Sequence, residues 1–223
     1  MMQDIGQYLV QIVLLLPIFL LSLSFHEFSH GYVSYLLGDP TAKRQGRLTL
    51  NPLAHLDPMG TLVLIITRMF GWAKPVPIDP RHYKDRDKGI ILVSIAGPAA
   101  NFLLAIIFAI LLRLIFARYN LVMRGSGIFG PRDLSDIVGL VVTMIQTGVF
   151  LNIALAIFNL IPIPPLDGSK ILRGILPRKY NSIFDSLEGG AGMIILVLLL
   201  FTGVLGRIIQ PVMFFFMRLL GPG

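Results

Sequence analysis

The sequence contains no cysteine, and charged residues are scarce. Asp, Glu, Lys and Arg make up 14% of its 223 residues, against roughly 25% in ordinary soluble domains. The absence of cysteine excludes a disulfide framework and any thiolate metal site, so a metal ion in this chain must be bound by His, Asp or Glu. With 55% hydrophobic residues, the composition is that of a membrane protein rather than a soluble domain.

Long apolar runs fill most of the chain. About 20 helical residues are enough to cross a bilayer, and apolar segments of at least that length lie at 5–37, 88–118, 134–163 and 191–219. The first has no Lys or Arg before it and no small-residue cleavage site, so we interpret it as a retained helix rather than a secretory signal. The sequence predicts an all-helical polytopic membrane protein with about four main transmembrane helices.

The last apolar segment contains Arg207 and Pro211, and its pattern fits either one bent span or two short helices. The loops between the apolar segments are too short to fold alone. We therefore expect a single membrane-embedded domain over residues 1–223.

The region between the first two apolar segments has a different composition. Its short apolar run, 59–71, has a length that is more typical of a re-entrant or interfacial segment than of a span. Proline and glycine clusters flank this run and break helices, and "GRLTL" at 46–50 has the pattern of a short strand. The sequence predicts a short re-entrant, β-containing segment here.

The net charge of +7 does not indicate a nucleic-acid partner. The Lys and Arg residues lie mainly in the loops between apolar segments, where the bias of cytoplasmic loops toward positive charge accounts for them. We expect the lipid bilayer, and no nucleic acid, as a partner of this protein.

Three ionisable residues, His26, Glu27 and His30, lie in "SFHEFSH" near the end of the first apolar segment. Residues i and i+4 share a face of a helix, so both histidines can reach one metal ion. Glu27, one step around the helix, has the place of the general base in zinc hydrolases. The alternative is a set of polar side chains packed between helices, but ionisable groups at membrane depth are expensive and usually functional.

A catalytic zinc ion typically has three protein ligands, so the sequence must supply one more. His55 and His82 lie in polar loops, where we expect solvated side chains, and Glu188 precedes the last apolar segment. The best candidate is Asp167 in "FNLIPIPPLDGSK", because an unpaired carboxylate among prolines after a long apolar helix would be costly. The alternative for Asp167 is an ordinary helix-exit turn.

A metal site shared by His26, His30 and Asp167 constrains the topology. The two helices that carry these residues must run in the same direction, which requires one complete crossing between them, by 88–118, and none by 59–71. Residues 38–88 and 165–190 then share one side and hold 13 of the 19 Lys and Arg residues. We therefore expect a multi-pass protein of the cell membrane, with its N-terminus outside and its site toward the cytoplasm.

The motifs "FHEFSHG" and "NLIPIPPLDG" closely resemble the two signatures of the site-2 protease family of intramembrane zinc metalloproteases, and "GPAAN" at 97–101 resembles a further family element. The resemblance covers nearly the whole chain, and we find no room for the PDZ or CBS domains of some relatives. It implies one catalytic Zn²⁺ per chain and the following site residues: His26, His30 and Asp167 on the metal, Glu27 as the catalytic residue, and Asn159 and Asn101 on the substrate.

The resemblance also implies a function, namely hydrolysis of peptide bonds within or near transmembrane segments, in regulated intramembrane proteolysis or clearance of remnant signal peptides. Transmembrane proteins are then the substrates, and we hypothesise that an unwound substrate pairs with a strand edge in the 44–80 region. One alternative is a membrane zincin that cleaves soluble or juxtamembrane peptides, for which Glu188 would be the third ligand. Another is a non-catalytic metal-binding or transport protein. The presence of Glu27 argues against a role in metal binding alone, and the concentration of polar residues at one depth of the spans argues against transport.

Overall fold

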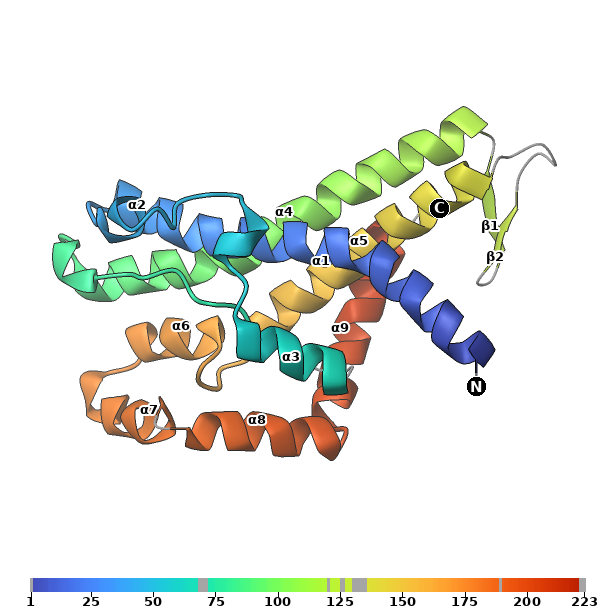
Figure 1. Cartoon of the computed structure of the whole chain (residues 1–223). Helices are drawn as coiled ribbons and strands as arrows, with labels where there is room; N and C mark the ends of the chain where they lie inside the picture. Colours follow the sequence, from blue (N-terminus) through green and yellow to red (C-terminus); the bar gives the residue numbers. More distant parts are fainter. Residues whose placement is uncertain are drawn as a thin grey trace.

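The computed structural model describes residues 2–67, 72–119, 121–124, 127–129, 136–188 and 190–220. Three long helices dominate the fold (Figure 1), and these are α1 (Met2–Leu36), α4 (Arg86–Tyr119) and α5 (Asp136–Asn159). Helix α4 packs against both α1 and α5. After α4, the antiparallel hairpin of β1 (Val122–Arg124) and β2 (Gly127–Phe129) extends from one end of the molecule.

The shorter elements form two groups. Between α1 and α4 lie α2 (Thr41–Arg44), η1 (Pro52–Ala54), α3 (Pro58–Thr67) and η2 (Pro80–His82). After α5 come α6 (Asp167–Ile175), η3 (Arg178–Tyr180), α7 (Asn181–Glu188), α8 (Ala191–Phe201) and α9 (Val204–Leu220). Helix α6 packs against α4, whereas α9 returns to pack against α5 (Figure 1). In Figure 1, α3 of the first group and α6, α7 and α8 of the second lie on the same side of the α1–α4 pair.

Two of the four expected membrane helices are confirmed by length and apolarity, since α4 and α5 each suffice to cross a bilayer. Among the described residues, a third candidate arises only if 178–188 and α8, bent by 72° at a short break, count as one span. The expected span at 191–219 is two helices. Gly203, with a φ of 72°, ends α8 in the left-handed conformation that glycine adopts readily, while Pro211 lies inside α9.

The prediction of a short strand at 46–50 was wrong. Gly46 has a φ of 65°, and the backbone polar groups of this segment bond locally instead of to a neighbouring strand. The Asn51 N–H donates to Thr49 Oγ1 at 3.1 Å, and the His55 side chain donates through Nε2 to the Thr49 carbonyl at 2.8 Å. Side-chain bonds of this kind compete with sheet formation.

The apolar run expected at 59–71 contains α3, which has 10 residues. At 1.5 Å per residue this helix is about 15 Å long, half the thickness of the bilayer core. The described helix is therefore too short to cross the bilayer core. Residues 68–71 of the predicted re-entrant segment lie outside the described part of the chain.

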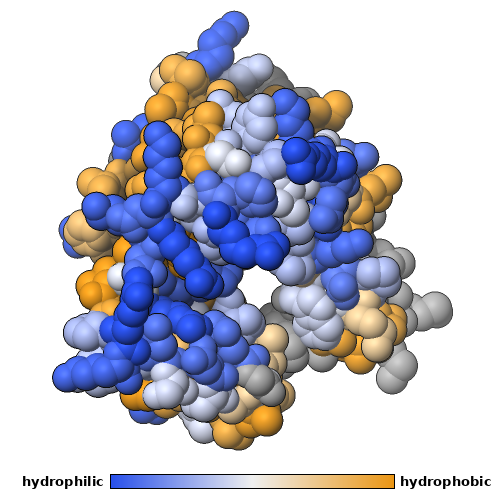
Figure 2. All heavy atoms as spheres, turned by 90° about the vertical axis from the view of Figure 1, so that its left-hand side faces the viewer, coloured by the Kyte–Doolittle hydropathy of each residue, from blue (hydrophilic) through white to orange (hydrophobic). Residues whose placement is uncertain are grey.

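The core lies where α1, α4, α5 and α9 meet, and it contains Leu104, Phe108, Val149 and Ile153 among its buried residues. Other apolar side chains of the same helices, such as Ile110 on α4, are more than half exposed. The end that carries α2, α6 and α7 is in contrast mainly hydrophilic, with apolar side chains toward its flanks (Figure 2). An apolar girdle with one polar end is the surface of a membrane protein.

Candidate metal centre

The structure brings His26 and His30, on successive turns of α1, together with Asp167, the first residue of α6. Asp167 Oδ2 lies 3.3 Å from His26 Nε2 and 3.1 Å from His30 Nε2, and the two Nε2 atoms are 3.0 Å apart. All three side chains are buried. The expected grouping of these residues is thus what the fold produces, through the packing of α4 against both α1 and α6.

The opposite ring nitrogen of each histidine is hydrogen-bonded to α4. His30 Nδ1 lies 2.7 Å from the Val93 carbonyl oxygen, and His26 Nδ1 lies 2.6 Å from Asn101 Oδ1. A carbonyl oxygen only accepts, so Nδ1 of His30 is the protonated nitrogen and donates to it. In the neutral ring, Nε2 of His30 therefore offers a lone pair toward Asp167.

The orientation of Asn101 is fixed by a buried chain of hydrogen bonds that reaches α5. Asn152 donates from Nδ2 to the Gly148 carbonyl and to Ser22 Oγ, each at 2.8 Å, so its Oδ1 faces Asn101. Asn101 donates from Nδ2 to that Oδ1 at 2.9 Å, which turns its own Oδ1 toward His26. Since an amide oxygen only accepts, Nδ1 of His26 carries the proton as well.

Whether His26, His30 and Asp167 fit a metal ion can be tested on the unprotonated atoms that they bring together. With both Nδ1 atoms protonated, His26 Nε2, His30 Nε2 and Asp167 Oδ2 are three lone-pair donors within 4.8 Å of one another. In a buried site they repel one another unless a positive charge lies between them. One proton bridges only two of these atoms, whereas a metal ion meets all three. Two imidazoles and a carboxylate are a donor set that zinc prefers.

Gly97, the first residue of "GPAAN", makes room for the two histidines. A Cβ atom on Gly97 would lie 2.4 Å from His30 Nε2 and 2.6 Å from His26 Cε1, which is far inside van der Waals contact. The segment 93–101 of α4 thus contributes to the site in three ways. Its Val93 carbonyl accepts a hydrogen bond from His30, Gly97 leaves space for both imidazoles, and the Asn101 amide oxygen accepts a hydrogen bond from His26. This explains in physical terms why that element accompanies the histidine motif.

Glu27 lies beside the three metal-ligand candidates and is 8% exposed. Its Oε2 accepts a hydrogen bond of 2.9 Å from the backbone N–H of Val76, in the extended segment between α3 and η2. Glu27 therefore lines the same cavity as His26 and His30 without belonging to their cluster. This is the place expected for a general base.

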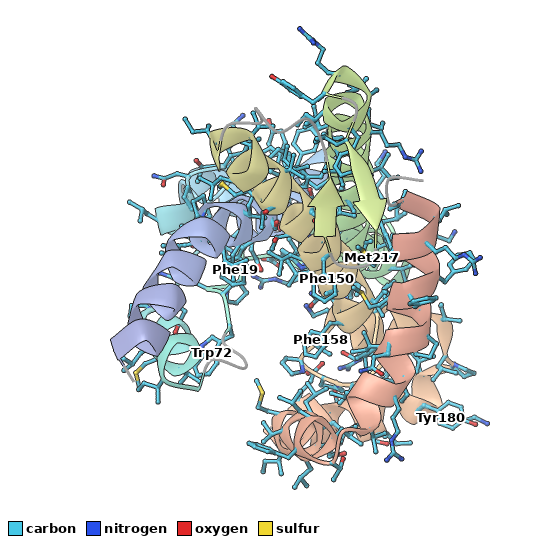
Figure 3. The ribbon with its side chains drawn as sticks, turned by 90° about the vertical axis from the view of Figure 1, so that its right-hand side faces the viewer. Phe19, Trp72, Phe150, Phe158, Tyr180 and Met217 are labelled. Atoms are coloured by element: carbon cyan, nitrogen blue, oxygen red, sulfur yellow. The ribbon has the colours of Figure 1, made fainter. Side chains whose placement is uncertain are left out.

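A cavity of about 1350 Å³ opens beside the cluster. Its wall contains apolar side chains from three separate regions, such as Val63, Ile90 and Val197, and charged side chains such as Arg86 and Lys170. An opening is visible in the hydrophilic face in Figure 2, and in Figure 3 Trp72 and Phe158 lie on opposite sides of an open space. The wall of the cavity thus combines apolar and charged surface.

Two asparagines were expected at the substrate, and the structure separates them. Asn159 lines the cavity, and its Nδ2 donates to the Leu155 carbonyl at 2.9 Å. Asn101 is fully buried, and both its amide atoms are engaged in the hydrogen bonds to His26 and Asn152.

The other candidates for the third ligand lie outside the cluster. His55 is fully buried, so the expectation of a solvated side chain was wrong for it, and its Nε2 donates to the Thr49 carbonyl of the same loop. His82 is partly exposed, with Nδ1 3.5 Å from Asp39 Oδ1. Glu188 forms an ion pair of 3.1 Å with Arg173.

A further buried carboxylate, that of Asp39, lies just after α1. It accepts hydrogen bonds from Ser34 Oγ at 2.8 Å, Thr41 N at 2.9 Å and Asp79 N at 2.8 Å. Burial raises the pKa of Asp39, but the hydrogen bonds, above all the one from the Asp79 backbone, outweigh it and hold the pKa below its usual value. Asp39 thereby ties the end of α1 to the segment that precedes α4.

The comparison with known proteins decides the family, because the profile of Peptidase family M50 matches residues 14–202. The chain belongs to peptidase family M50. This confirms the resemblance to site-2 proteases and the expectation of a metalloprotease.

Among M50 relatives, the Bacillus subtilis protein named "Putative zinc metalloprotease YwhC" is 42% identical over 179 residues, which are 80% of this chain and 76% of that protein. The protein named "Putative zinc metalloprotease Rip2" of Mycolicibacterium smegmatis is 31% identical over 207 residues, 90% of this chain and 71% of that protein. No solved structure matches this M50 chain.

Sequence reasoning missed Asn152, Val76 and Val93, whose carbonyl accepts a hydrogen bond from His30. Asn152 is a polar residue within an apolar helix, and this was a signal that could have marked it. Val76 contributes its backbone N–H, so its side chain carries no signal for this contact.

Proposed function

We propose that this M50 peptidase is an intramembrane zinc endopeptidase that hydrolyses peptide bonds within or near transmembrane segments of membrane proteins, in regulated intramembrane proteolysis or removal of remnant signal peptides. The observation that carries the proposal is the convergence of three buried lone-pair donors beside Glu27, on helices that pack with the membrane-length helices α4 and α5. A site so buried among apolar helices is suited to a membrane-embedded substrate.

In this proposal His26, His30 and Asp167 hold one zinc ion per chain. The names of the two relatives, both described as zinc metalloproteases, support zinc as the metal. When bound, zinc supplies Lewis-acid polarisation of a carbonyl and a lowered pKa of water. The protein contributes the fixed orientation of the two imidazoles, through Val93 O and Asn101 Oδ1.

Glu27 is the proposed catalytic residue. It accepts a proton from the attacking water and later delivers it to the departing amine nitrogen. Its position in the cavity wall, one residue from His26 but outside the ligand cluster, supports this role. A general acid–base group of this kind typically contributes 10²–10⁴-fold to a rate, roughly what its removal should cost.

Asn159 is the proposed substrate-binding residue, because it lines the cavity and its Oδ1 remains available while Nδ2 bonds its own helix. That oxygen is an acceptor for a backbone N–H of an unwound substrate. For Asn101 we propose a role in orienting His26 in place of substrate binding, because its two amide atoms already bond to side chains of the protein.

The proposed topology has the N-terminus outside and the catalytic pocket toward the cytoplasm. The four expected passes are then α1, α4, α5 and the C-terminal helices, with α3 entering the membrane without crossing it. The basic residues on 38–88 and 165–190, which flank the pocket, support this orientation. A single domain spans the chain.

The hypothesis that an unwound substrate pairs with a strand edge in the 44–80 region must exclude residues 74–77 as amide donors. Of the backbone amides at 74–77, Lys74 N donates to the His55 carbonyl at 3.0 Å and Val76 N donates to Glu27, while Pro75 and Pro77 have none. These residues therefore offer no amide to a substrate strand. Asn159, in the wall of the same cavity, provides an acceptor instead.

The test compares two fluorogenic probes in proteoliposomes. One is a model transmembrane peptide of about 20 apolar residues with a central helix-weakening Asn-Gly, and the other is a soluble peptide with the same central residues. We expect the wild type to cleave the membrane probe, Glu27→Gln to leave it intact, and a chelator to stop cleavage until zinc is restored. Equal or faster cleavage of the soluble probe would contradict the intramembrane assignment and favour the membrane zincin.

A further inference from the structure

The hydrogen bond between Val76 and Glu27 joins two segments that are far apart in sequence. The Val76 N–H donates to Glu27 Oε2 at 2.9 Å, in a buried environment. Val76 itself is 6% exposed, and its Cγ1 packs over Gly31, one helical turn beyond Glu27. The contact is therefore part of a packed interface between α1 and the segment 72–79, not a surface encounter.

The segment that carries Val76 is fixed on both sides. Before Val76, Arg47 donates from Nη2 to the carbonyls of Lys74 at 2.9 Å and Pro75 at 3.3 Å. After it, the Asp79 N–H donates to the fully buried Asp39 carboxylate at 2.8 Å. The Val76 N–H is thus held at a defined place by the two ends of its own segment.

The prolines on either side give the segment a further property. Pro75 and Pro77 have no N–H and restrict the chain between them to extended conformations. Val76 is consequently the one amide donor of the Pro-Val-Pro triplet, and no helix or sheet competes for it. The triplet presents a single N–H to a single carboxylate.

We propose that the Val76 backbone N–H is a positioning group for the catalytic carboxylate: it holds Glu27 Oε2 so that Oε1 is left for proton transfer. This inference rests on the proposed function of Glu27. The terminal torsion of a glutamate is soft, so without a partner its oxygens sample many positions. Misplacement of a reacting group by about 1 Å can cost on the order of 10²-fold in rate.

Two substitutions separate the amide from the side chain. Val76→Pro removes the N–H and keeps an extended backbone, whereas the matched control Val76→Ala removes most of the side chain and keeps the N–H. With the membrane probe, we expect Val76→Pro to lower kcat by about 10–100-fold with little change in KM or zinc content. Val76→Ala should keep kcat within about threefold, since the loss of packing alone leaves the carboxylate held. Equal kcat in the two variants would overturn the inference.

Hydrogen exchange tests the same bond without any measurement of activity. Because of its prolines and because residue 74 becomes the amino terminus, the fragment 74–78 reports on the amides of Val76 and Ile78 only. We expect one of them to lose protection when Glu27 is changed to Ala and to keep it in Glu27→Gln, which retains an acceptor oxygen. Unchanged protection in Glu27→Ala would contradict the inference even if the wild type is an active protease. A wild type that cleaves neither probe would contradict the proposed function instead.

Discussion

Two buried carboxylates, Asp39 and Asp167, lie in the same molecule with opposite surroundings. Asp39 is fully buried and accepts hydrogen bonds from two backbone amides and from the hydroxyls of Ser34 and Thr41. Asp167 is 5% exposed, and its Oδ2 faces the Nε2 atoms of two histidines whose protons are held on the other side of the ring. The first carboxylate has donors from the protein, and the second has acceptors.

This difference separates a structural carboxylate from a proposed metal ligand. Hydrogen-bond donors around Asp39 compensate the charge of its carboxylate. Asp39 therefore holds two segments together and needs no cation beside it. Around Asp167 the nearest donor is Lys170 Nζ, 3.3 Å from Oδ1, and Oδ2 is left with two lone pairs opposite it. A buried carboxylate that faces acceptors is where a cation is needed.

The largest expected effect on cleavage comes from Glu27, a carboxylate that is neither structural like Asp39 nor a proposed metal ligand like Asp167. Glu27→Gln should lower cleavage of the membrane probe by about 10²–10⁴-fold, because the amide cannot accept the proton of the attacking water. Zinc content should stay at that of the wild type, since Glu27 lies outside the cluster of donors. Loss of zinc from Glu27→Gln would place Glu27 among the ligands and contradict its role as a base.

The next effect concerns the clearance that the ligand cluster requires. In Gly97→Ala the added methyl group would overlap both imidazoles, so we expect zinc affinity, measured by competition with a chelator, to fall by about 100-fold or more. Gly206→Ala is the matched control in a helix, because a Cβ there meets nothing within 4 Å. Equal zinc affinity in the two variants would show that the histidines are not packed against α4 as described.

A smaller effect is expected from the chain of amides behind His26. Asn152→Leu removes the acceptor that orients Asn101, so His26 loses its fixed proton position and zinc affinity should fall by about 10-fold. Asn159→Leu, in the same helix, is the control and should raise KM without changing zinc affinity. If both variants bound zinc like the wild type, the orientation of His26 would not depend on Asn152.

The smallest effect should appear at Asp39, and it should be on stability rather than on zinc. Asp39→Asn places an NH₂ group among donors, at a cost of about 2 kcal/mol in the free energy of unfolding. We expect the unfolding midpoint in detergent to fall by about 4–8 °C while zinc content is kept. If Asp39→Asn lost zinc as well as stability, the distinction between Asp39 as a structural carboxylate and Asp167 as a metal ligand would be contradicted.

The pKa of Asp39 gives that stability a pH dependence. Because its folded pKa is lower than its usual value, its contribution is present above about pH 4 and is lost as the pH falls through the folded pKa. The neighbouring Asp79, whose pKa the Arg81 guanidinium lowers to about 2, has the same sign. The wild type should lose stability below about pH 4 more steeply than Asp39→Asn, as thermal unfolding at a series of pH values would show.

The sequence predicted that His26, His30 and Asp167 lie together because their chemistry is carried by side chains in recognisable spacing. His26, His30 and Asp167 meet as expected, and α4 and α5 have the expected length for spans. The error at 46–50 could not be foreseen from the sequence, because the alternation of polar and apolar residues there fits a strand. Only the hydrogen bonds to Thr49, from Asn51 and His55, show that the segment is not one. Val76 acts through its backbone, which no residue pattern reveals.

The most direct test of the account is the zinc content of the purified protein in detergent, compared for wild type, Asp167→Ala and Asp39→Ala. We predict about one zinc ion per chain in the wild type and in the less stable Asp39→Ala, and little or none in Asp167→Ala. Zinc retained at the same level in Asp167→Ala, or lost equally from both variants, would contradict the claim that the surroundings of Asp167 make it a metal ligand.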